Sequence, residues 1–275
     1  CIMLNITLPG GVIREVEEGT TLDALCRDIS MGLYRNACAA YVNGKVADLR
    51  NALTEDCEVA ILTFDDLDGR KAYWHTLSHV MAQAVKRLYP DVKLAIGPSI
   101  DEGFYYDFDT DFSVTPEVLE AIEAEMKKII KEGIEITRFT LPRAEALKRM
   151  ADEPYKVELI NDLPADAEIS FYTQGDFTDL CAGPHLDHTG RLRHNGFKLT
   201  KSCGAYWRGD SNRKMLQRIY GIGFPSKDEL DAYLKAQEEA LKRDHNKLGR
   251  ELEFFTTVEE IGQGLPILLP KGARV

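Results

Sequence analysis

The sequence lacks any long hydrophobic run, which excludes one class of protein at once. No stretch of its 275 residues approaches the roughly 18 consecutive apolar residues of a membrane-spanning helix. The N-terminal segment alternates between apolar and polar residues, and its apolar run is too short for a secretory signal peptide. We therefore expect a protein that has no membrane partner and is not secreted.

Cysteine is also scarce, and its spacing follows no disulfide framework. A chain of this length can bury a large core without cross-links, so the few thiols are expected to be free in a reducing cytoplasm. The six cysteines are Cys1, Cys26, Cys38, Cys57, Cys181 and Cys203.

Positive charge is in short supply as well. There are 34 Lys and Arg residues against 45 Asp and Glu, and the net charge of −11 argues against indiscriminate binding to nucleic acid. One segment differs, because eight basic residues between Arg191 and Arg218 are balanced only by Asp210. This basic segment is either a solvated face or a phosphate-binding strip, in which Tyr206 and Trp207 could stack on unpaired bases.

Two short motifs carry most of the chemistry. His75 and His79 are four positions apart, and so are Cys181 and His185. Imidazole and thiol groups bind zinc or move protons near neutral pH. The metalloprotease helix motif is excluded, because it needs a glutamate general base directly after the first histidine and this chain has Thr76 there.

The two motifs predict different local structures. Apolar residues recur at helical spacing from Tyr73 to Tyr89, and Pro90 ends the pattern. The two histidines fall opposite the apolar stripe, toward solvent, a cleft or another domain. In the second motif, Gly183-Pro184 disfavours a helix and predicts a rigid turn.

The order of predicted elements indicates an α+β protein. Residues 1–64 read as a β-grasp unit, with hairpin turns at Pro9–Gly11 and Asn43-Gly44 around a short helix. A larger α+β region follows over 70–225, in which strands and helices do not alternate as in a doubly wound sheet. A helix is predicted over 116–132, with Thr115 as N-cap and Gly133 as its stop.

The last part of the chain begins with a capping box, Ser226 to Glu229, that predicts a charged connecting helix over 226–248. Residues 249–275 are expected to start a further unit.

Several segments together resemble the amino-terminal part of the bacterial threonyl-tRNA synthetase family. The resemblance implies a TGS domain (1–64), an editing domain related to that of alanyl-tRNA synthetase (70–225), a linker helix (226–248) and the start of a class II aminoacylation domain (249–275). The segments that carry it are His75-x3-His79, Ala95–Pro98, Gly103–Asp107, Tyr155–Val157, Asp179–His185 and Gly204–Asn212.

The resemblance also implies an activity, a partner and cofactors. The expected reaction is hydrolysis of serine wrongly esterified to threonine tRNA. The class II signature motifs would lie beyond Val275, so ATP, magnesium and a structural zinc would belong to that core and not to this segment. A full-length protein would dimerise through the core, whereas the present segment would be a monomer.

Site residues follow from the resemblance as well. The implied catalytic residues are His75, His79, Lys156, Cys181 and His185; the implied substrate-binding residues are Tyr106, Asp179, Tyr206 and Arg208. Editing in this family implies no metal. A rival interpretation is a zinc hydrolase of the alanyl type that uses His75, His79, Cys181 and His185. A second rival is a non-catalytic tRNA-binding or regulatory module.

Overall fold

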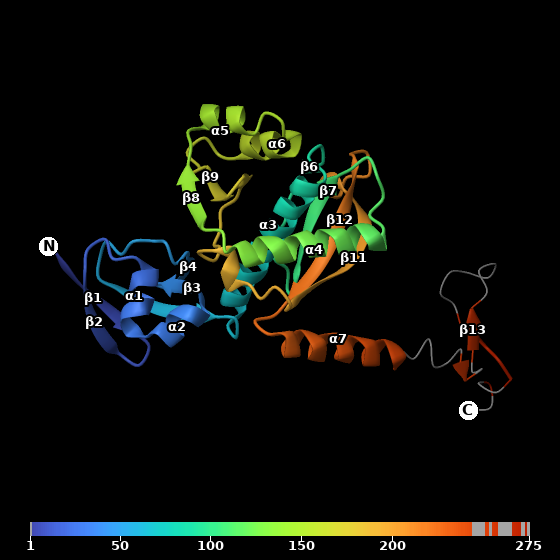
Figure 1. The fold of residues 1–275 in the computed structure, drawn as a ribbon, viewed down its shortest axis with the longest axis horizontal. Helices are drawn as coiled ribbons and strands as arrows, with labels where there is room; N and C mark the ends of the chain where they lie inside the picture. Colours follow the sequence, from blue (N-terminus) through green and yellow to red (C-terminus); the bar gives the residue numbers. More distant parts are fainter. Residues whose placement is uncertain (1, 244–250, 253–254, 258–265, 271–272, 274–275) are drawn as a thin grey trace. The chain divides into compact units, whose positions relative to one another are not determined.

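A computed structural model describes residues 2–243, 251–252, 255–257, 266–270 and 273 of the chain (Figure 1). Contacts divide the chain into two compact units, Cys1–Lys227 and Asp228–Val275. The first unit contains every candidate site residue. The boundary proposed near residue 64 therefore lies inside one compact unit and stays a prediction about domains.

The first unit begins with a five-stranded mixed sheet. Its strand order is β2-β1-β5-β3-β4, with β1 parallel to β5 and the other pairs antiparallel. This confirms the predicted β-grasp, and only the short helix α2 was not expected. The elements are β1 (Met3–Leu8), β2 (Val12–Glu17), α1 (Leu22–Ile29), α2 (Met31–Asn36), β3 (Ala37–Val42), β4 (Lys45–Ala47) and β5 (Cys57–Thr63).

A four-stranded antiparallel sheet forms the centre of the following region. Its order is β11-β12-β7-β6, and α3 packs against both β7 and β12. Helix α4 lies beside α3 and crosses the same sheet (Figure 1). The elements are α3 (Leu67–Leu88), β6 (Lys93–Leu94), β7 (Phe104–Asp109), α4 (Pro116–Glu132), β11 (Phe197–Tyr206) and β12 (Met215–Gly223).

The bounds of α4 agree with its sequence signals. The Thr115 side chain accepts a hydrogen bond from the Val118 amide, and Gly133 ends the helix with a left-handed φ of 61°. A hydroxyl cap and a glycine stop satisfy the backbone groups that a helix leaves unpaired at its ends.

Helix α3 is enclosed on nearly every side, so one expectation needs correction. The histidine side was expected to face solvent, a cleft or another domain, and the solvent alternative is wrong because His79 is only 3% exposed. The apolar side of α3 packs on the central sheet, where Trp74 Nε1 donates to the carbonyl of Gly223 at 2.7 Å. The histidine side is covered by other parts of the same unit.

A smaller sheet, ordered β10-β9-β8, supplies that cover. Two features here were not predicted. Asp179 was expected in a loop but lies in β10, and Lys156 lies on a helix whose apolar residues do not form one stripe. The elements are β8 (Ile136–Thr140), α5 (Arg143–Arg149), α6 (Pro154–Asp162), β9 (Ser170–Gln174) and β10 (Phe177–Leu180), followed by the short helices η1 (Thr189–Arg191) and η2 (Trp207–Gly209).

The second unit is described in part. Helix α7 spans Lys227–Lys242, and a short antiparallel pair is formed by β13 (Phe255–Thr257) and β14 (Pro266–Leu268). The predicted helix over 226–248 is thus present as far as 242, and residues 244–248 lie outside the described residues. Most of 249–275 also lies outside them. No helix within the described ranges is long and apolar enough to cross a membrane.

Candidate active site

The fold brings the two sequence motifs together. His75 and His79 come from α3, and Cys181 and His185 come from the loop after β10. Their ligand atoms all lie within 4.8 Å of one another. The Cys181 thiol is 3.4 Å from His75 Nε2 and 3.2 Å from His185 Nε2. We call these four residues the His/Cys cluster.

Two glycines allow this close approach. Gly183 has a left-handed φ of 78°, and a Cβ there would lie 2.1 Å from the hydroxyl of Tyr172. A Cβ on Gly97 would lie 1.9 Å from the ring of Tyr106. Only a residue without a side chain fits at these two positions, which explains Gly183 in the second motif and Gly97 in the segment Ala95–Pro98.

Hydrogen bonds fix which nitrogen of His185 carries the proton. The Thr76 hydroxyl donates to the Ala72 carbonyl at 2.9 Å, so its oxygen must accept from His185 Nδ1 at 3.2 Å and from the Leu186 amide at 3.0 Å. His185 is therefore protonated on Nδ1, which leaves a free lone pair on Nε2 toward the thiol of Cys181. A nitrogen lone pair held in this way can accept a proton or bind a metal.

A buried charge pair lies beside the His/Cys cluster. Lys156 and Asp179 are 3% and 1% exposed, and Lys156 Nζ is 2.7 Å from Asp179 Oδ1. This contact is an ion pair between two buried charges. Tyr106 donates to Asp179 Oδ2 at 2.6 Å and accepts from Lys156 at 3.0 Å. His79 Nε2 is 3.6 Å from the same carboxylate oxygen, so the charge pair and the cluster form one continuous site.

Burial keeps the imidazoles and the thiol neutral. It lowers the pKa of His79 to about 3 and that of the less deeply buried His75 to about 4. The pKa of His185 lies well below 6.5 for the same reason. Burial also raises the pKa of the Cys181 thiol to about 12. Each shift arises because a low-dielectric interior disfavours the charged form.

The carboxylate keeps its charge despite burial. Burial by itself would raise the pKa of Asp179, but the charge of Lys156, together with the contacts from His79 and Tyr106, outweighs this effect and the pKa is lowered. The pKa of Tyr106 lies well above 10, because the ring is buried and faces this carboxylate. The Lys156–Asp179 charge pair therefore lies beside neutral imidazoles, a neutral thiol and a neutral phenol.

These shifts predict a pH dependence of stability for the metal-free chain. His79 binds a proton in the unfolded state below pH 6.5 but in the folded state only near pH 3. The free energy of unfolding should fall as pH falls from 6.5 toward 4, by about 1.4 kcal/mol per pH unit for this histidine. We expect His79→Gln to flatten the slope by that amount in urea unfolding curves. His188→Gln is the control, because that side chain is 41% exposed. Identical slopes for both variants and the parent would contradict the prediction.

The residues of the His/Cys cluster fit a tetrahedral zinc ion. Zinc binds imidazole nitrogen at about 2.0–2.1 Å and thiolate sulfur at about 2.3 Å, which places neighbouring ligand atoms about 3.3–3.8 Å apart. Two sulfur–nitrogen distances, 3.2 and 3.4 Å, are close to this range, and all four ligand atoms lie within 4.8 Å of one another. His75, His79, Cys181 and His185 would be the ligands.

Two residues predicted to bind substrate lie elsewhere. Tyr206 is 39% exposed at the end of β11. Arg208 follows it in η2 and pairs with Glu158 and Asp162 of α6. Among the described contacts, none joins either residue to the His/Cys cluster, and their roles stay predictions.

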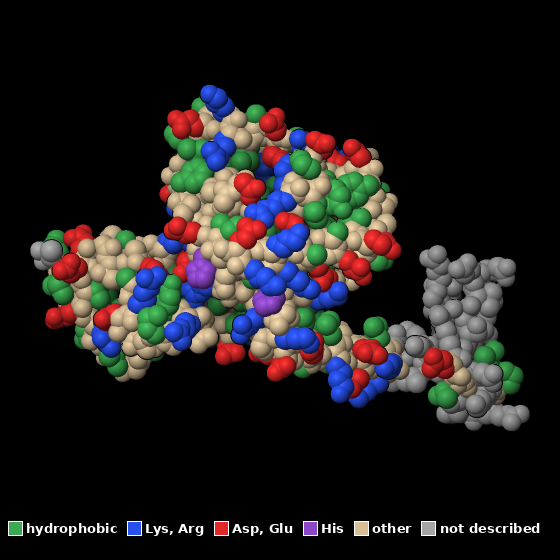
Figure 2. All heavy atoms as spheres, in the orientation of Figure 1, with side chains coloured by type: hydrophobic (Ala, Val, Ile, Leu, Met, Phe, Trp, Pro, Cys, Tyr) green, Lys and Arg blue, Asp and Glu red, His purple; other side chains and the backbone are tan. Residues whose placement is uncertain are grey.

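The basic segment 191–218 is largely neutralised by neighbouring acids. Figure 2 shows Lys and Arg interspersed with Asp and Glu on the face in view. Trp207 is 2% exposed and donates to Glu158, so the expectation that it stacks on bases is wrong. The structure favours a solvated face over a phosphate-binding strip. The ion pairs are Arg191–Asp187, Lys198–Glu123, Arg208–Asp162, Arg213–Glu158, Lys214–Asp109 and Arg218–Asp107.

Three residues at the site were missed by the sequence analysis. Thr76 was noted only as the residue that excludes a metalloprotease. Tyr172 packs its ring against His185, with ring centroids 4.5 Å apart. Asp48 accepts hydrogen bonds from the Tyr172 hydroxyl and the His185 amide. A hydroxyl at the position after His75 was a usable signal, whereas Asp48 and Tyr172 carried none.

Comparisons with known proteins agree with this architecture. Residues 4–63 match the TGS domain, and residues 169–220 match the family described as "Threonyl and Alanyl tRNA synthetase second additional domain". A threonine–tRNA ligase of Clostridium perfringens is 61% identical over 273 residues. Those of Clostridium tetani and Acetivibrio thermocellus are 59% and 58% identical over 275 and 272 residues.

These matches cover 98–99% of the chain but only 42–43% of each relative. The chain thus spans about two fifths of the length of the curated relatives it matches. The resemblance expected from the sequence motifs is confirmed. Over nearly its whole length the chain is similar to the amino-terminal part of threonine–tRNA ligases, and it matches a TGS domain followed by the second additional domain named for threonyl and alanyl synthetases.

Proposed function

We propose that residues 70–225 form an editing domain that hydrolyses serine wrongly attached to threonine tRNA. The observation that carries the proposal is the junction of the His/Cys cluster with the buried Lys156–Asp179 pair. Neutral proton acceptors and a fixed positive charge are what ester hydrolysis by water requires. In this proposal the TGS domain, residues 1–64, precedes the editing domain in the chain and does not itself carry out the hydrolysis.

The proposed reaction is a simple acyl transfer to water. A water oxygen attacks the seryl carbonyl carbon, and the bond between that carbon and the ribose oxygen breaks. One water proton is accepted by an imidazole and ends on the ribose hydroxyl, so the products are serine and free tRNA. His185 is the favoured acceptor, because its Nε2 lone pair is fixed by the bond from Nδ1 to Thr76. His75 and His79 hold the water and the terminal ribose.

Charge stabilisation falls to Lys156. Its ammonium would face the oxyanion that develops at the carbonyl, in a site where little water screens the interaction. Asp179 and Tyr106 would hold the amine and hydroxyl of the seryl group. Cys181 is not proposed as a nucleophile, because its raised pKa leaves the thiol protonated at neutral pH.

Threonine and serine differ by one methyl group, which explains the need for such a site. One methyl is worth roughly 1–3 kcal/mol of binding in an apolar pocket, too little for accurate translation. A second site that cleaves the serine ester removes the error.

The first test is ester hydrolysis by the 275-residue chain. We expect seryl-tRNA to be cleaved at least about 10-fold faster than threonyl-tRNA, because the extra methyl must be excluded from a packed site. Release of labelled amino acid measures both rates, and a variant with His75→Ala and His79→Ala is the matched control. If the parent releases no more serine than this control, the proposal is wrong. Salt-sensitive binding of tRNA without turnover would instead support the non-catalytic module.

The geometry of the His/Cys cluster favours one second candidate, a zinc hydrolase. A bound zinc would polarise the ester and lower the pKa of a bound water. We expect hydrolysis to stay within about twofold of its rate after chelation, because Lys156 and the imidazoles supply the charge and proton acceptance that zinc would provide. Metal analysis of the purified chain accompanies the assay. Loss of activity on chelation, restored by zinc in the parent but not in Cys181→Ser, would establish the zinc hydrolase.

A further inference from the structure

One turn of the TGS domain reaches into the candidate active site. Leu49 is 1% exposed and belongs to the core of the first sheet. Its neighbours Asp48 and Arg50 face the other way and are joined to each other, since Asp48 Oδ1 accepts from the Arg50 amide at 3.0 Å and from its guanidinium at 2.8 Å. The Asp48 and Arg50 side chains are thus bonded to each other, and Leu49 between them anchors their backbone in the core of the TGS domain.

This pair binds the backbone of His185 on both sides. Asp48 Oδ2 accepts from the His185 amide at 3.2 Å, and Arg50 donates to the His185 carbonyl at 3.0 Å. The same guanidinium also donates to the carbonyls of Leu186, at 2.5 Å, and Ile136, at 2.9 Å. One arginine therefore fixes three carbonyls, which its planar fork of donors suits and a lysine ammonium does not.

Asp48 also reaches the ring of His185 through a second residue. Its Oδ2 accepts from the Tyr172 hydroxyl at 2.7 Å, and the Tyr172 ring packs edge-on against the imidazole. Asp48 is 6% exposed, so each of its bonds is made away from solvent. Loss of the carboxylate would leave a buried amide and a buried hydroxyl without a partner, which costs more than a hydrogen bond normally contributes.

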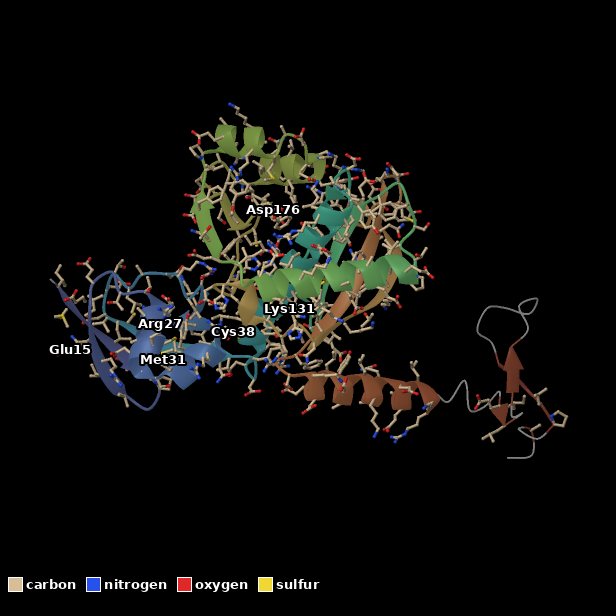
Figure 3. The ribbon with its side chains drawn as sticks, viewed as in Figure 1. Glu15, Arg27, Met31, Cys38, Lys131 and Asp176 are labelled. Carbon is tan, nitrogen blue, oxygen red and sulfur yellow. The ribbon has the colours of Figure 1, made fainter. Side chains whose placement is uncertain are left out.

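A second contact holds the same loop farther along. Arg191 donates to the carbonyls of Tyr34 and Ala37 at 2.5 Å each, and the Tyr34 hydroxyl donates to Asp187 at 2.9 Å. Arg27, labelled in Figure 3, donates to the same hydroxyl at 2.9 Å. The segment from His185 to Arg191 is therefore bound to the TGS domain at both ends.

We propose that Asp48 and Arg50 of the TGS domain are positioning residues for His185 in ester hydrolysis. The inference rests on the proposed function, and it gives the TGS domain a role in the editing step itself. The pair holds the backbone from which the imidazole projects, while Thr76 and Tyr172 hold the ring. An unsupported His185 would lose the fixed direction of its Nε2 lone pair, and misplacement of a catalytic group by about 1 Å can cost about 100-fold in rate.

The test compares Asp48→Ala, Asp48→Asn and Arg50→Lys in the 275-residue chain. We expect Asp48→Ala to lower kcat for seryl-tRNA about 10- to 100-fold, a range typical when the support of a functional histidine is removed. KM should change by less than about twofold, because neither residue is proposed to touch tRNA. Asp48→Asn keeps one acceptor oxygen and should fall between Ala and the parent. Arg50→Lys keeps the charge but should lose most of the rate.

The matched control is the exposed ion pair Arg14–Asp28 of the same domain, with side chains 42% and 65% exposed. Alanine at either position should leave kcat unchanged. Nitrogen-15 spectra of labelled histidine rings give a second readout, in which the His185 signals should move in the Asp48 variants and not in the control.

Two results separate this inference from the proposed function. If the parent hydrolyses seryl-tRNA and the folded Asp48→Asn and Arg50→Lys variants keep its kcat and its His185 signals, the positioning role is wrong. If the parent has no hydrolase activity, the proposed function fails. In that case the nitrogen-15 spectra of the histidine rings are the remaining test of whether Asp48 and Arg50 set the position of His185.

Discussion

Replacement of Lys156 by alanine should lower kcat for seryl-tRNA hydrolysis by about 100- to 1,000-fold. This range is typical when one preorganised donor to an oxyanion is removed. Lys156 is 3% exposed, and its ammonium contacts Asp179 and Tyr106. An interaction that forms mainly as charge develops should affect kcat more than KM. Single-turnover release of serine measures the chemical step directly.

Lys148→Ala is the matched control for this prediction, because Lys148 is an exposed lysine on the neighbouring helix α5. Its rate should equal that of the parent. Lys156→Met tests the charge separately, since methionine fills similar space without a positive group. If Lys156→Met retains more than about one tenth of the parent rate, the ammonium does not stabilise the transition state.

Asp179→Ala should destabilise the chain by about 3–5 kcal/mol. The substitution leaves the ammonium of Lys156 buried beside a neutral tyrosine, and an unpaired buried charge has a cost of this size. Urea unfolding followed by circular dichroism measures the change. Asp176→Ala is the control from the same hairpin (labelled in Figure 3). The Asp176 side chain is 68% exposed, so this substitution should cost no more than about 1 kcal/mol.

The double variant Lys156→Met, Asp179→Leu separates charge from packing. Replacement of a buried ion pair by apolar side chains of similar size is often neutral or stabilising. We expect it to recover most of the stability lost in Asp179→Ala, while the rate of hydrolysis stays as low as in Lys156→Met. If the double variant is as unstable as Asp179→Ala, packing and not an unpaired charge explains the loss.

Local rules predicted the parts of the fold that depend on neighbours in the sequence. Thr115, Pro116 and Gly133 gave the bounds of α4 because caps and stops act within one turn of a helix. The spacing of His75 and His79, together with the Gly183 turn, predicted a helix pair and a loop pair of ligands. Their meeting within 4.8 Å depended on the whole topology, and the family resemblance indicated it.

Long-range contacts were beyond the reach of these rules. Asp48 looks like an ordinary residue after a hairpin strand, and its partner His185 lies 137 positions away. Trp207 looked available for stacking because it lies inside the basic segment 191–218, but it packs against Tyr155 of α6. Whether a side chain is buried depends on which element, often distant in the sequence, packs beside it in space. The local periodicity of the sequence does not encode that packing.

The enclosure of α3 has a consequence for how the site can be reached. Elements that pack on all sides exchange their amide hydrogens only in the rarest openings of a protein. Helix α3 contacts β3 and β5 of the first sheet, β7 and β12 of the central sheet, and α4. His75 and His79 therefore belong to a helix that we expect to undergo local unfolding only rarely. If binding of an aminoacyl end requires a movement, we expect it in the loop that carries Cys181 and His185, whose position depends on the bonds from Asp48 and Arg50 of the TGS domain.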